Sequence, residues 1–342
     1  MKNLSYILLL FFCISSCTEN KKKPNEVNLY SQRHYKVDEA QYKRFEELTG
    51  IKVNVVKANA DELIERLKNE GENSPADLFI SVDAGKLQKA SSLGLLQKVS
   101  SSSISENIFD YLEDPNGYWV PITYRARILV YSKERVDPSE LTTYQDLVDE
   151  KWKNRILVRS SSNAYNQALM TSIVANDGPA AASEWANALV ANFARDPKGS
   201  DRDQVKAIAA GQGDVAIVNS YYIGLLLTSD DEEQLNAGKS VGVFFPNQGE
   251  GESGTHINIS GIGLTKDAPN KENALKLIEY LTGEEAQLNY SNTSFEYPIN
   301  PKVAPSNIIA EWGSFRVDSL DLNQLGVHRS SAIKIFDNSD WK

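Results

Sequence analysis

Soft metal ligands are scarce in this chain of 342 residues, which contains two cysteines, two methionines and three histidines. Two cysteines are too few for a disulfide framework or for a zinc site built from thiolates. Basic residues are also in the minority, because 36 Lys and Arg stand against 46 Asp and Glu and leave a net charge of -10. This balance argues against nucleic acid as a partner, because no basic field is available to contact phosphates. Tyrosine, by contrast, occurs 15 times.

The N-terminal segment predicts export. Lys2 precedes an apolar run over residues 4–16, which is too short to span a bilayer but fits the core of a signal peptide. The run ends in Ile14-Ser15-Ser16-Cys17, which resembles the lipobox of bacterial lipoproteins. The resemblance implies that residues 1–17 form a signal ending at a lipidated Cys17, followed by a tether over residues 18–26. An ordinary signal peptide with an incidental cysteine is the alternative.

Export and lipidation would leave the folded part of the chain without a free thiol. Cys13 would be lost with the signal peptide, and Cys17 would carry the lipid. We therefore expect an extracytoplasmic protein that is anchored to a bacterial membrane, on the periplasmic side or at the cell surface. No later segment of the sequence is apolar enough to span a membrane.

Beyond the tether, strand-like and helix-like segments alternate, which predicts an α/β protein with parallel strands. The helix over residues 38–48 is expected to begin at Asp38 as its N-cap, with Gln41 completing a capping box. Segments over residues 118–124 and 128–132 are expected to form two strands. Further strands are expected over residues 27–30, 51–56, 77–82, 155–158, 214–218, 241–245 and 256–264, and further helices over residues 60–67, 178–193, 202–210 and 223–227 and from about residues 165 and 270.

An exported α/β chain of this size without a catalytic motif suggests a two-lobed binding protein. Extended strands near residues 120–130 and 240–250 are expected to join the lobes. The ligand would lie between them, where strand ends and helix N-termini converge. We expect residues 27–122 and 248–297 to form lobe 1, and residues 123–247 and 298–342 to form lobe 2.

Tyrosines occur in three expected strand-to-helix loops, at His34-Tyr35, at Tyr165 and at Tyr221-Tyr222. Any one of these taken alone is more simply explained as packing. Three such loops line the same cleft edge in this architecture, which favours a shared site. A hard trivalent cation can displace the phenol proton, whose free pKa is about 10, and bind the phenolate oxygen. Copper(I) or zinc would instead call for Cys, Met or several His.

At these residues the sequence resembles the ferric-iron-binding proteins of bacterial ABC importers, in particular the cyanobacterial-type branch induced by iron deficiency. The resemblance extends over nearly all of the mature chain. It is carried by LYSQRHY (29–35), SPADLFISVD (74–83), RAR (125–127), LVRSSSNAYNQ (157–167), FAR (193–195), NSYY (219–222), VGVFFPNQ (241–248), GTHINISGIG (254–263) and the C-terminal stretch ending at Trp341-Lys342.

The resemblance implies a type II periplasmic-binding fold, or venus flytrap, that closes on one Fe(III). The implied partners are an ABC permease and its ATPase, with the receptor itself a monomer. A synergistic anion is left open. The implied metal ligands are His34, Tyr35, Tyr165, Tyr221 and Tyr222, with Arg125 behind them offsetting phenolate charge.

Several details of this implied site stay open at the level of sequence. The imidazole of His34 could swing away and leave four phenolates and a water. Tyr124 is expected to pack or to form a hydrogen bond behind the ligands, with direct ligation as a lesser alternative. Members of the branch carry Arg three residues after the tyrosine pair, whereas this chain has Leu225, which alters the expected charge balance.

Two other functions compete with iron binding. The same fold could hold a small organic ligand or an oxyanion, such as a polyamine or thiamine, with aromatic rings stacking on it. The turn Ser160-Ser161-Ser162 could offer an anion its hydroxyls and amides, although a simple capping turn explains it as well. A secreted hydrolase is disfavoured, because the chain has no GxSxG or HExxH motif. We therefore do not expect an enzyme.

Overall fold

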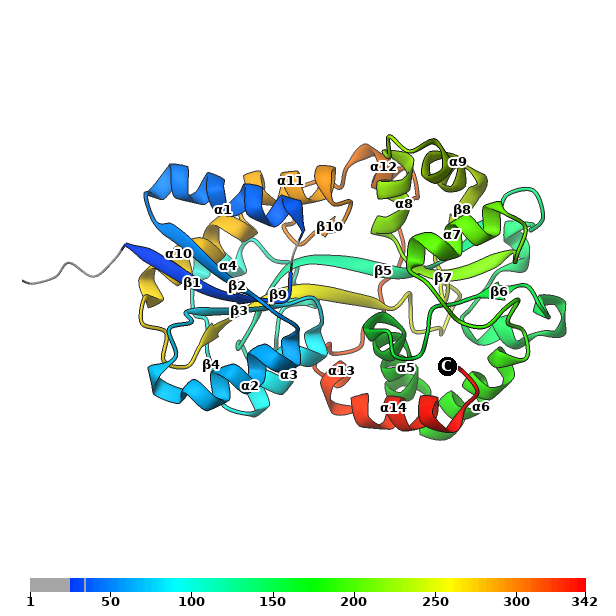
Figure 1. The fold of residues 1–342 in the computed structure, drawn as a ribbon, viewed down its shortest axis with the longest axis horizontal. Coiled ribbons are helices and arrows are strands. Elements are labelled where there is room, and N and C mark those ends of the chain that lie inside the picture. The colour runs from blue at the N-terminus through cyan, green and yellow to red at the C-terminus, as the bar shows by residue number, and fades with distance from the viewer. Residues whose placement is uncertain (1–24, 34) are drawn as a thin grey trace, which may run out of the picture.

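A computed structural model describes residues 25–33 and 35–342. The signal peptide, Cys17 and His34 lie outside the described residues, so the predictions made for them remain predictions. The chain forms two α/β lobes that are joined by long strands (Figure 1). None of the helices in the described part of the chain is long and apolar enough to cross a membrane.

Lobe 1 is built on parallel strands from the first part of the chain. β1 (Glu26–Ser31) pairs in parallel with both β2 (Lys52–Lys57) and β3 (Leu78–Ser81). The connecting helices are α1 (Lys36–Thr49) and α2 (Ala60–Glu70), which confirms the expected βαβ pattern. The remaining elements of this lobe are α3 (Ala84–Ser92), β4 (Leu96–Gln97), α4 (Ser102–Ser105), α10 (Lys271–Thr282), α11 (Glu284–Thr293) and β10 (Tyr297–Pro298).

Two strands connect the lobes. β5 (Val120–Ser132) is continuous over 13 residues, where the sequence suggested two strands. Its first half pairs with β9 (Ile257–Thr265), and its second half pairs with β7 (Val215–Asn219). The second connecting strand is therefore β9 and not the segment near residues 240–250. That segment begins with β8 (Val241–Phe244), which pairs only with the last residues of β5.

Lobe 2 is built around β5, β7 and β8, with β6 (Ile156–Leu157) in parallel beside β7. The strand order across the whole sheet is β2-β1-β3-β9-β5-β7-β6. The helices of this lobe are α5 (Ala164–Asp177), α6 (Pro179–Val190), α7 (Asp201–Ala209), α8 (Tyr221–Leu227) and α9 (Glu232–Ser240). The C-terminal segment contributes α12 (Asn307–Ala310), which lies near α8 at the top of Figure 1, and α13 (Gln324–Val327) and α14 (Arg329–Asn338), which lie near α5 and α6 at the bottom.

Candidate metal centre

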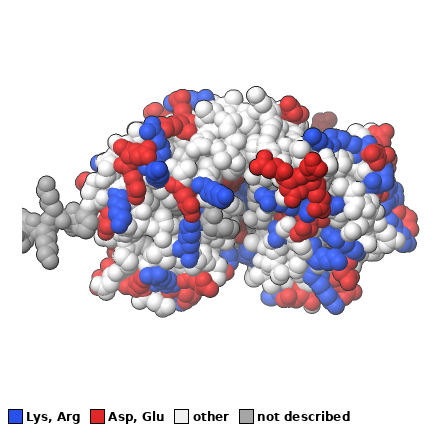
Figure 2. All heavy atoms as spheres, turned by 45° about the horizontal axis from the view of Figure 1, so that its top comes forward, with Lys and Arg blue, Asp and Glu red and all other residues white. Residues whose placement is uncertain are grey.

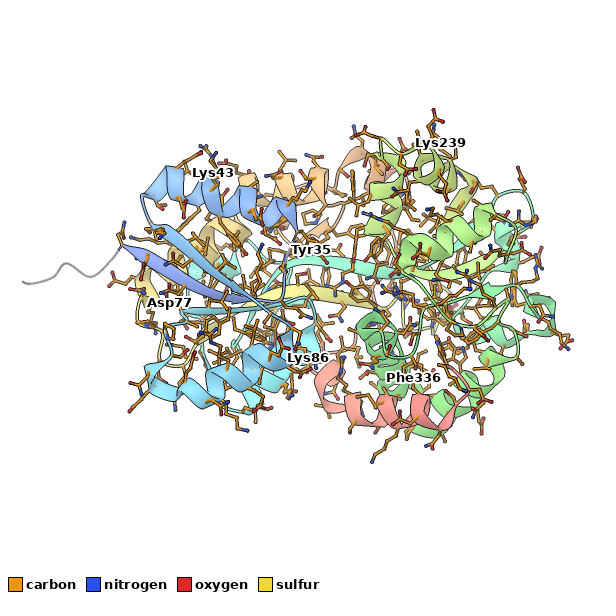
Figure 3. The ribbon with its side chains drawn as sticks, viewed as in Figure 1. Tyr35, Lys43, Asp77, Lys86, Lys239 and Phe336 are labelled. Carbon is orange, nitrogen blue, oxygen red and sulfur yellow. The ribbon has the colours of Figure 1, made fainter. Side chains whose placement is uncertain are left out.

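The predicted tyrosines lie where strands end and helices begin. Tyr35 directly precedes α1, after the loop that leaves β1. Tyr165 is in the first turn of α5, where its backbone N–H donates to the N-cap Asn163 Oδ1 at 3.0 Å. Tyr221 and Tyr222 open α8, two residues after β7 ends. Figure 3 shows Tyr35 near the middle of the molecule, where lobe 1 faces lobe 2.

The phenols come together although they are distant in sequence. The Tyr221 hydroxyl donates to the Tyr165 hydroxyl, with 3.2 Å between the oxygens. The rings of Tyr221 and Tyr222 have centroids 4.3 Å apart. One cavity of about 420 Å³ between the lobes is lined by Tyr35, Tyr221 and Leu225. The surface of the molecule is hollowed where the two lobes meet (Figure 2). Phenols of both lobes therefore adjoin one space.

A buried ionic cluster holds the segment before α1. Asp38 Oδ1 accepts from Arg33 Nε at 2.9 Å, and Asp38 Oδ2 accepts from the Tyr35 backbone N–H at 3.2 Å. Glu296 also binds Arg33, with 2.9 Å between Oε2 and Nη2. All three charged side chains are almost fully buried. The expected N-cap at Asp38 is therefore wrong: α1 starts earlier, because this carboxylate is drawn to Arg33 and to the backbone of Tyr35.

Arg125, which the resemblance places behind the ligands, lies beside Tyr165. Its guanidinium carbon is 5.8 Å from the centroid of the Tyr165 ring. Nη2 donates to the carbonyl oxygen of Val82, whereas Nη1 is buried and has no hydrogen-bond partner among the described residues. A buried guanidinium without a carboxylate partner favours negative charge nearby. A phenolate would supply that charge.

Three further arginines were not found from the sequence, because they come from separate segments and only the fold places them together. The guanidinium carbons of Arg159 and Arg127 lie 5.7 Å and 6.0 Å from the Tyr165 ring centroid. Arg202 lies 5.9 Å from the ring centroid of Tyr222 and lines the cleft with Leu225. Asp201 offsets part of this charge, since it accepts from Arg127 at 2.5 Å and from Arg159 at 2.6 Å.

Burial governs the protonation of the phenols. It raises the pKa of Tyr222 to about 12, with further contributions from Tyr165 and Asp201. Burial also raises the pKa of Tyr35 and of Tyr221 well above the usual range, and each is further raised by the negative charge that neighbouring phenolates would carry. These three phenols are therefore protonated at neutral pH in the unliganded chain. A cation that bound their phenolate form would have to release the protons.

The other residues singled out from the sequence have structural surroundings. Tyr124 is buried and stacks on Tyr297 with ring centroids 4.9 Å apart, which agrees with the packing role expected for it. Ser160 accepts from the Ser162 backbone N–H at 3.2 Å, as in the expected capping turn before α5. His256 is buried in lobe 2 beside Arg127. Among the described residues, no group of three or more His, Cys, Asp and Glu could hold a metal ion.

Comparison with known proteins decides the family. A family model described as "Bacterial extracellular solute-binding protein" matches residues 40–316. The chain belongs to this family. It is 44% identical over 337 residues to "Iron uptake protein A1" of Synechocystis sp., which covers 96% of this chain and 93% of that protein.

Solved structures confirm the two-lobed α/β fold and the resemblance to ferric-binding proteins. A Trichodesmium protein, described as IdiA and FutA in complex with iron and citrate ligands, is 46% identical with a TM-score of 0.87. The alignment covers 93% of this chain and all of that one. A ferric binding protein from Campylobacter jejuni is 42% identical with a TM-score of 0.86, covering 92% of this chain and 100% of its own.

Proposed function

We propose that this solute-binding protein is a receptor for ferric iron. Tyr35, Tyr165, Tyr221 and Tyr222 would bind Fe(III) as phenolates in the cleft between the lobes, with His34 as a fifth ligand. The observation that carries the proposal is the convergence of phenols from both lobes on one cleft, beside an arginine whose Nη1 lacks a partner among the described residues. Oxygen ligands of this kind suit a hard trivalent ion.

Charge supports the choice of ligand. Four phenolates around Fe(III) carry a net charge near -1, which calls for a nearby cation in a buried site. Arg125, Arg159 and Arg202 are placed to offset that charge, because each guanidinium lies within 6 Å of a ring centroid of the cluster. They would also compensate for Leu225, where the branch carries a positive charge.

The family and the N-terminal segment support a role in delivery of the bound iron. Closure of the lobes on the ion would create the shape that docks on an ABC permease driven by its ATPase. Lipid on Cys17 would keep the receptor at the membrane, with residues 18–26 as the tether. In this role the protein binds and hands over iron without catalysing a reaction.

The direct test is an optical titration of the purified protein with Fe(III). Wild type should develop a visible phenolate-to-iron charge-transfer band. Tyr221→Phe should weaken iron binding by at least about 100-fold, because even groups that only orient a metal ligand are worth 10- to 100-fold. The matched control is Tyr118→Phe, which changes a half-buried tyrosine beside Lys98, outside the cluster.

The competing reading is the same fold with a small organic ligand or an oxyanion. Calorimetry with a polyamine, thiamine and phosphate would then give binding that Tyr221→Phe barely changes. Absence of the coloured band, together with iron affinity unaltered in Tyr221→Phe and Tyr222→Phe, would contradict the ferric proposal.

A further inference from the structure

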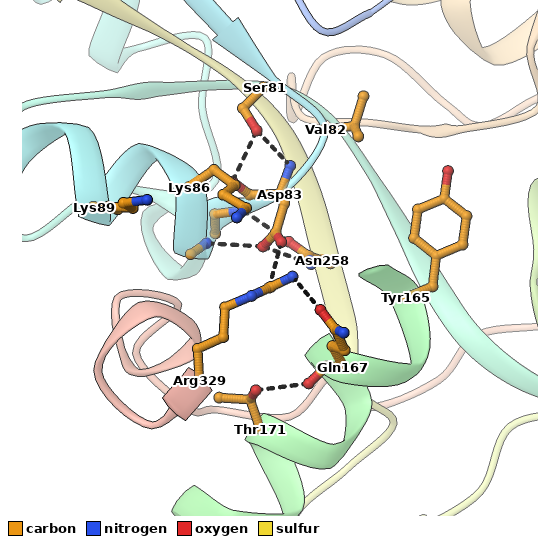
Figure 4. Close-up of polar contacts among 12 residues, drawn as sticks. Ser81, Val82, Asp83, Lys86, Lys89, Tyr165, Gln167, Thr171, Asn258 and Arg329 are labelled. Atoms are coloured by element: carbon orange, nitrogen blue, oxygen red, sulfur yellow. Dashed lines mark hydrogen bonds and ion pairs between the residues drawn. The ribbon is translucent and has the colours of Figure 1, made fainter. Parts of the chain in front are cut away.

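One guanidinium connects both lobes close to the phenols. Arg329 Nη1 lies 2.7 Å from Asp83 Oδ2, and Arg329 Nη2 donates to Gln167 Oε1 at 2.8 Å (Figure 4). Asp83 is the N-cap of α3 in lobe 1, and Gln167 lies in α5 of lobe 2. The ion pair is largely shielded from water, since the Arg329 side chain is 13% exposed and the Asp83 side chain 4%. Shielding makes such a charge-assisted bond strong.

The segment that leads to Arg329 is docked on lobe 1. Asn323 Nδ2 donates to Asp114 Oδ1 at 2.9 Å, and Asn323 Oδ1 accepts from Trp119 Nε1 at 3.3 Å. α13 then approaches α3 so closely that a Cβ atom added to Gly85 would lie 2.6 Å from the Leu325 carbonyl oxygen. Only glycine allows this approach at residue 85.

The segment that follows Arg329 is docked on lobe 2. Ala332, Ile335 and Phe336 of α14 are buried in the same apolar cluster as Leu169 and Ile173 of α5. Residues 323–336 therefore cross from lobe 1 to lobe 2, in addition to the connections that β5 and β9 make. Arg329 lies at the point where this segment changes lobes.

The contacts of Arg329 lie next to the candidate metal ligands. Gln167 is two residues after Tyr165, in the same first turns of α5. Asp83 follows Val82, whose carbonyl oxygen accepts from Arg125. Movement of α5 away from α3 would thus separate Asp83 from Gln167 and carry Tyr165 away from lobe 1.

We propose that Arg329 is a positioning residue: with Asp83 and Gln167 it forms a latch that holds the lobes at the separation at which Tyr165 approaches Tyr35. Only the expected effect of the latch on iron release rests on the proposed function. The effect on lobe separation does not depend on what the cleft binds. A contact made in only one arrangement of the lobes shifts the population toward that arrangement by its own free energy.

The test uses small-angle X-ray scattering of the iron-free protein and the rate of iron release to a chelator. Arg329→Gln should enlarge the radius of gyration of the iron-free protein and speed iron release by about tenfold, as for loss of one charge-assisted bond. Arg329→Lys keeps the charge but has one nitrogen in place of the two Nη atoms that contact Asp83 and Gln167. Its radius of gyration and its rate of iron release should therefore lie between those of wild type and Arg329→Gln. The rate of iron association should change less than the rate of iron release.

Arg135→Gln is the matched control, because Arg135 pairs with Asp214 at 2.6 Å within lobe 2. It should leave scattering and release unchanged. Asp83→Asn is the second test of the latch, because it removes the charge that pairs with Arg329. In the wild-type chain Asp83 Oδ1 accepts from the Gly85 backbone N–H at 2.9 Å, and the amide oxygen of Asn can still accept this bond. If Arg329→Gln and Asp83→Asn both scatter like wild type, the latch is disproved. If wild type takes up no iron, the ferric proposal fails, while the scattering still decides the latch.

Discussion

The phenol oxygens of Tyr165 and Tyr221 lie 3.2 Å apart, although 56 residues separate them in the chain. The hydrogen bond between them requires that at least one phenol be protonated. Burial raises the pKa of Tyr221 well above its usual range, which keeps that proton in place at neutral pH. Metal binding to both oxygens would replace this hydrogen bond and expel the protons.

Proton release gives the first prediction. Ferric iron supplied as the same chelate should release about one proton fewer from Tyr222→Phe than from wild type, because that phenol, with its pKa raised to about 12, must ionise to bind. Apparent iron affinity should consequently fall as the pH falls. A pH-indicator dye in weak buffer measures the release. Tyr118→Phe should match wild type, and equal release from Tyr222→Phe would show that Tyr222 does not bind as phenolate.

The ionic cluster at Arg33 gives a second prediction. Glu296→Gln should lower the free energy of unfolding by about 3 kcal/mol, because it leaves the buried Arg33 with Asp38 as its one remaining carboxylate. Arg33 outweighs burial and holds the pKa of Glu296 below its usual range, so the contribution of Glu296 is present at neutral pH and is lost as the pH falls. Urea unfolding measures the change.

The control for this variant is Glu285→Gln. Glu285 pairs with Arg44 at 2.7 Å, but both side chains are about half exposed. Exposed pairs contribute little, so the midpoint of unfolding should not move. Equal effects of the two variants would mean that the buried pair stabilises the fold no more than an exposed pair does.

His256 gives a prediction on pH. Burial, together with Arg127 and Arg125, lowers the pKa of His256 from 6.5 to about 3 in the folded chain. The unfolded chain takes up a proton below about pH 6.5, whereas the folded chain does not, so stability is lost as the pH falls. Between about pH 7.5 and about pH 5 the loss from this group should be about 2 kcal/mol.

The measurement is urea unfolding of the iron-free protein at several pH values. His256→Gln removes the titrating group, so its stability should fall less steeply with decreasing pH than that of wild type. Parallel curves for the two proteins would show that His256 takes up its proton as readily in the folded chain as in the unfolded chain.

Gly224 gives a prediction about α8. A Cβ atom at this position would lie 2.6 Å from the Cβ atom of Phe295, whose backbone has a positive φ of 56°. Gly224→Ala should therefore destabilise the fold by about 2 kcal/mol through overpacking. It should also weaken the iron-dependent colour, because α8 carries Tyr221 and Tyr222. Unchanged stability and colour would show that Phe295 moves aside without cost.

Much of the fold and part of the site could be predicted from local patterns. The alternation of apolar segments and helix signals identified the first βαβ unit, because periodicity and capping depend on neighbours in sequence. The same patterns placed Tyr35, Tyr165 and Tyr221-Tyr222 in strand-to-helix loops. They failed at Asp38, which is the third residue of α1 and not its N-cap: its carboxylate closes a capping box with the backbone of Tyr35 and also pairs with the buried Arg33.

The sequence by itself determined the class of donor available to a ligand: phenols in loops, no cysteine beyond residue 17 and few histidines. Only the tertiary structure decided that β5 is one continuous connection, that Arg159 and Arg202 flank the phenols, and that Arg329 links Asp83 to Gln167. The arginine contacts join residues from separate segments. Their physical cause is the burial of charged groups, which are stable inside a protein only where the fold brings a partner within reach.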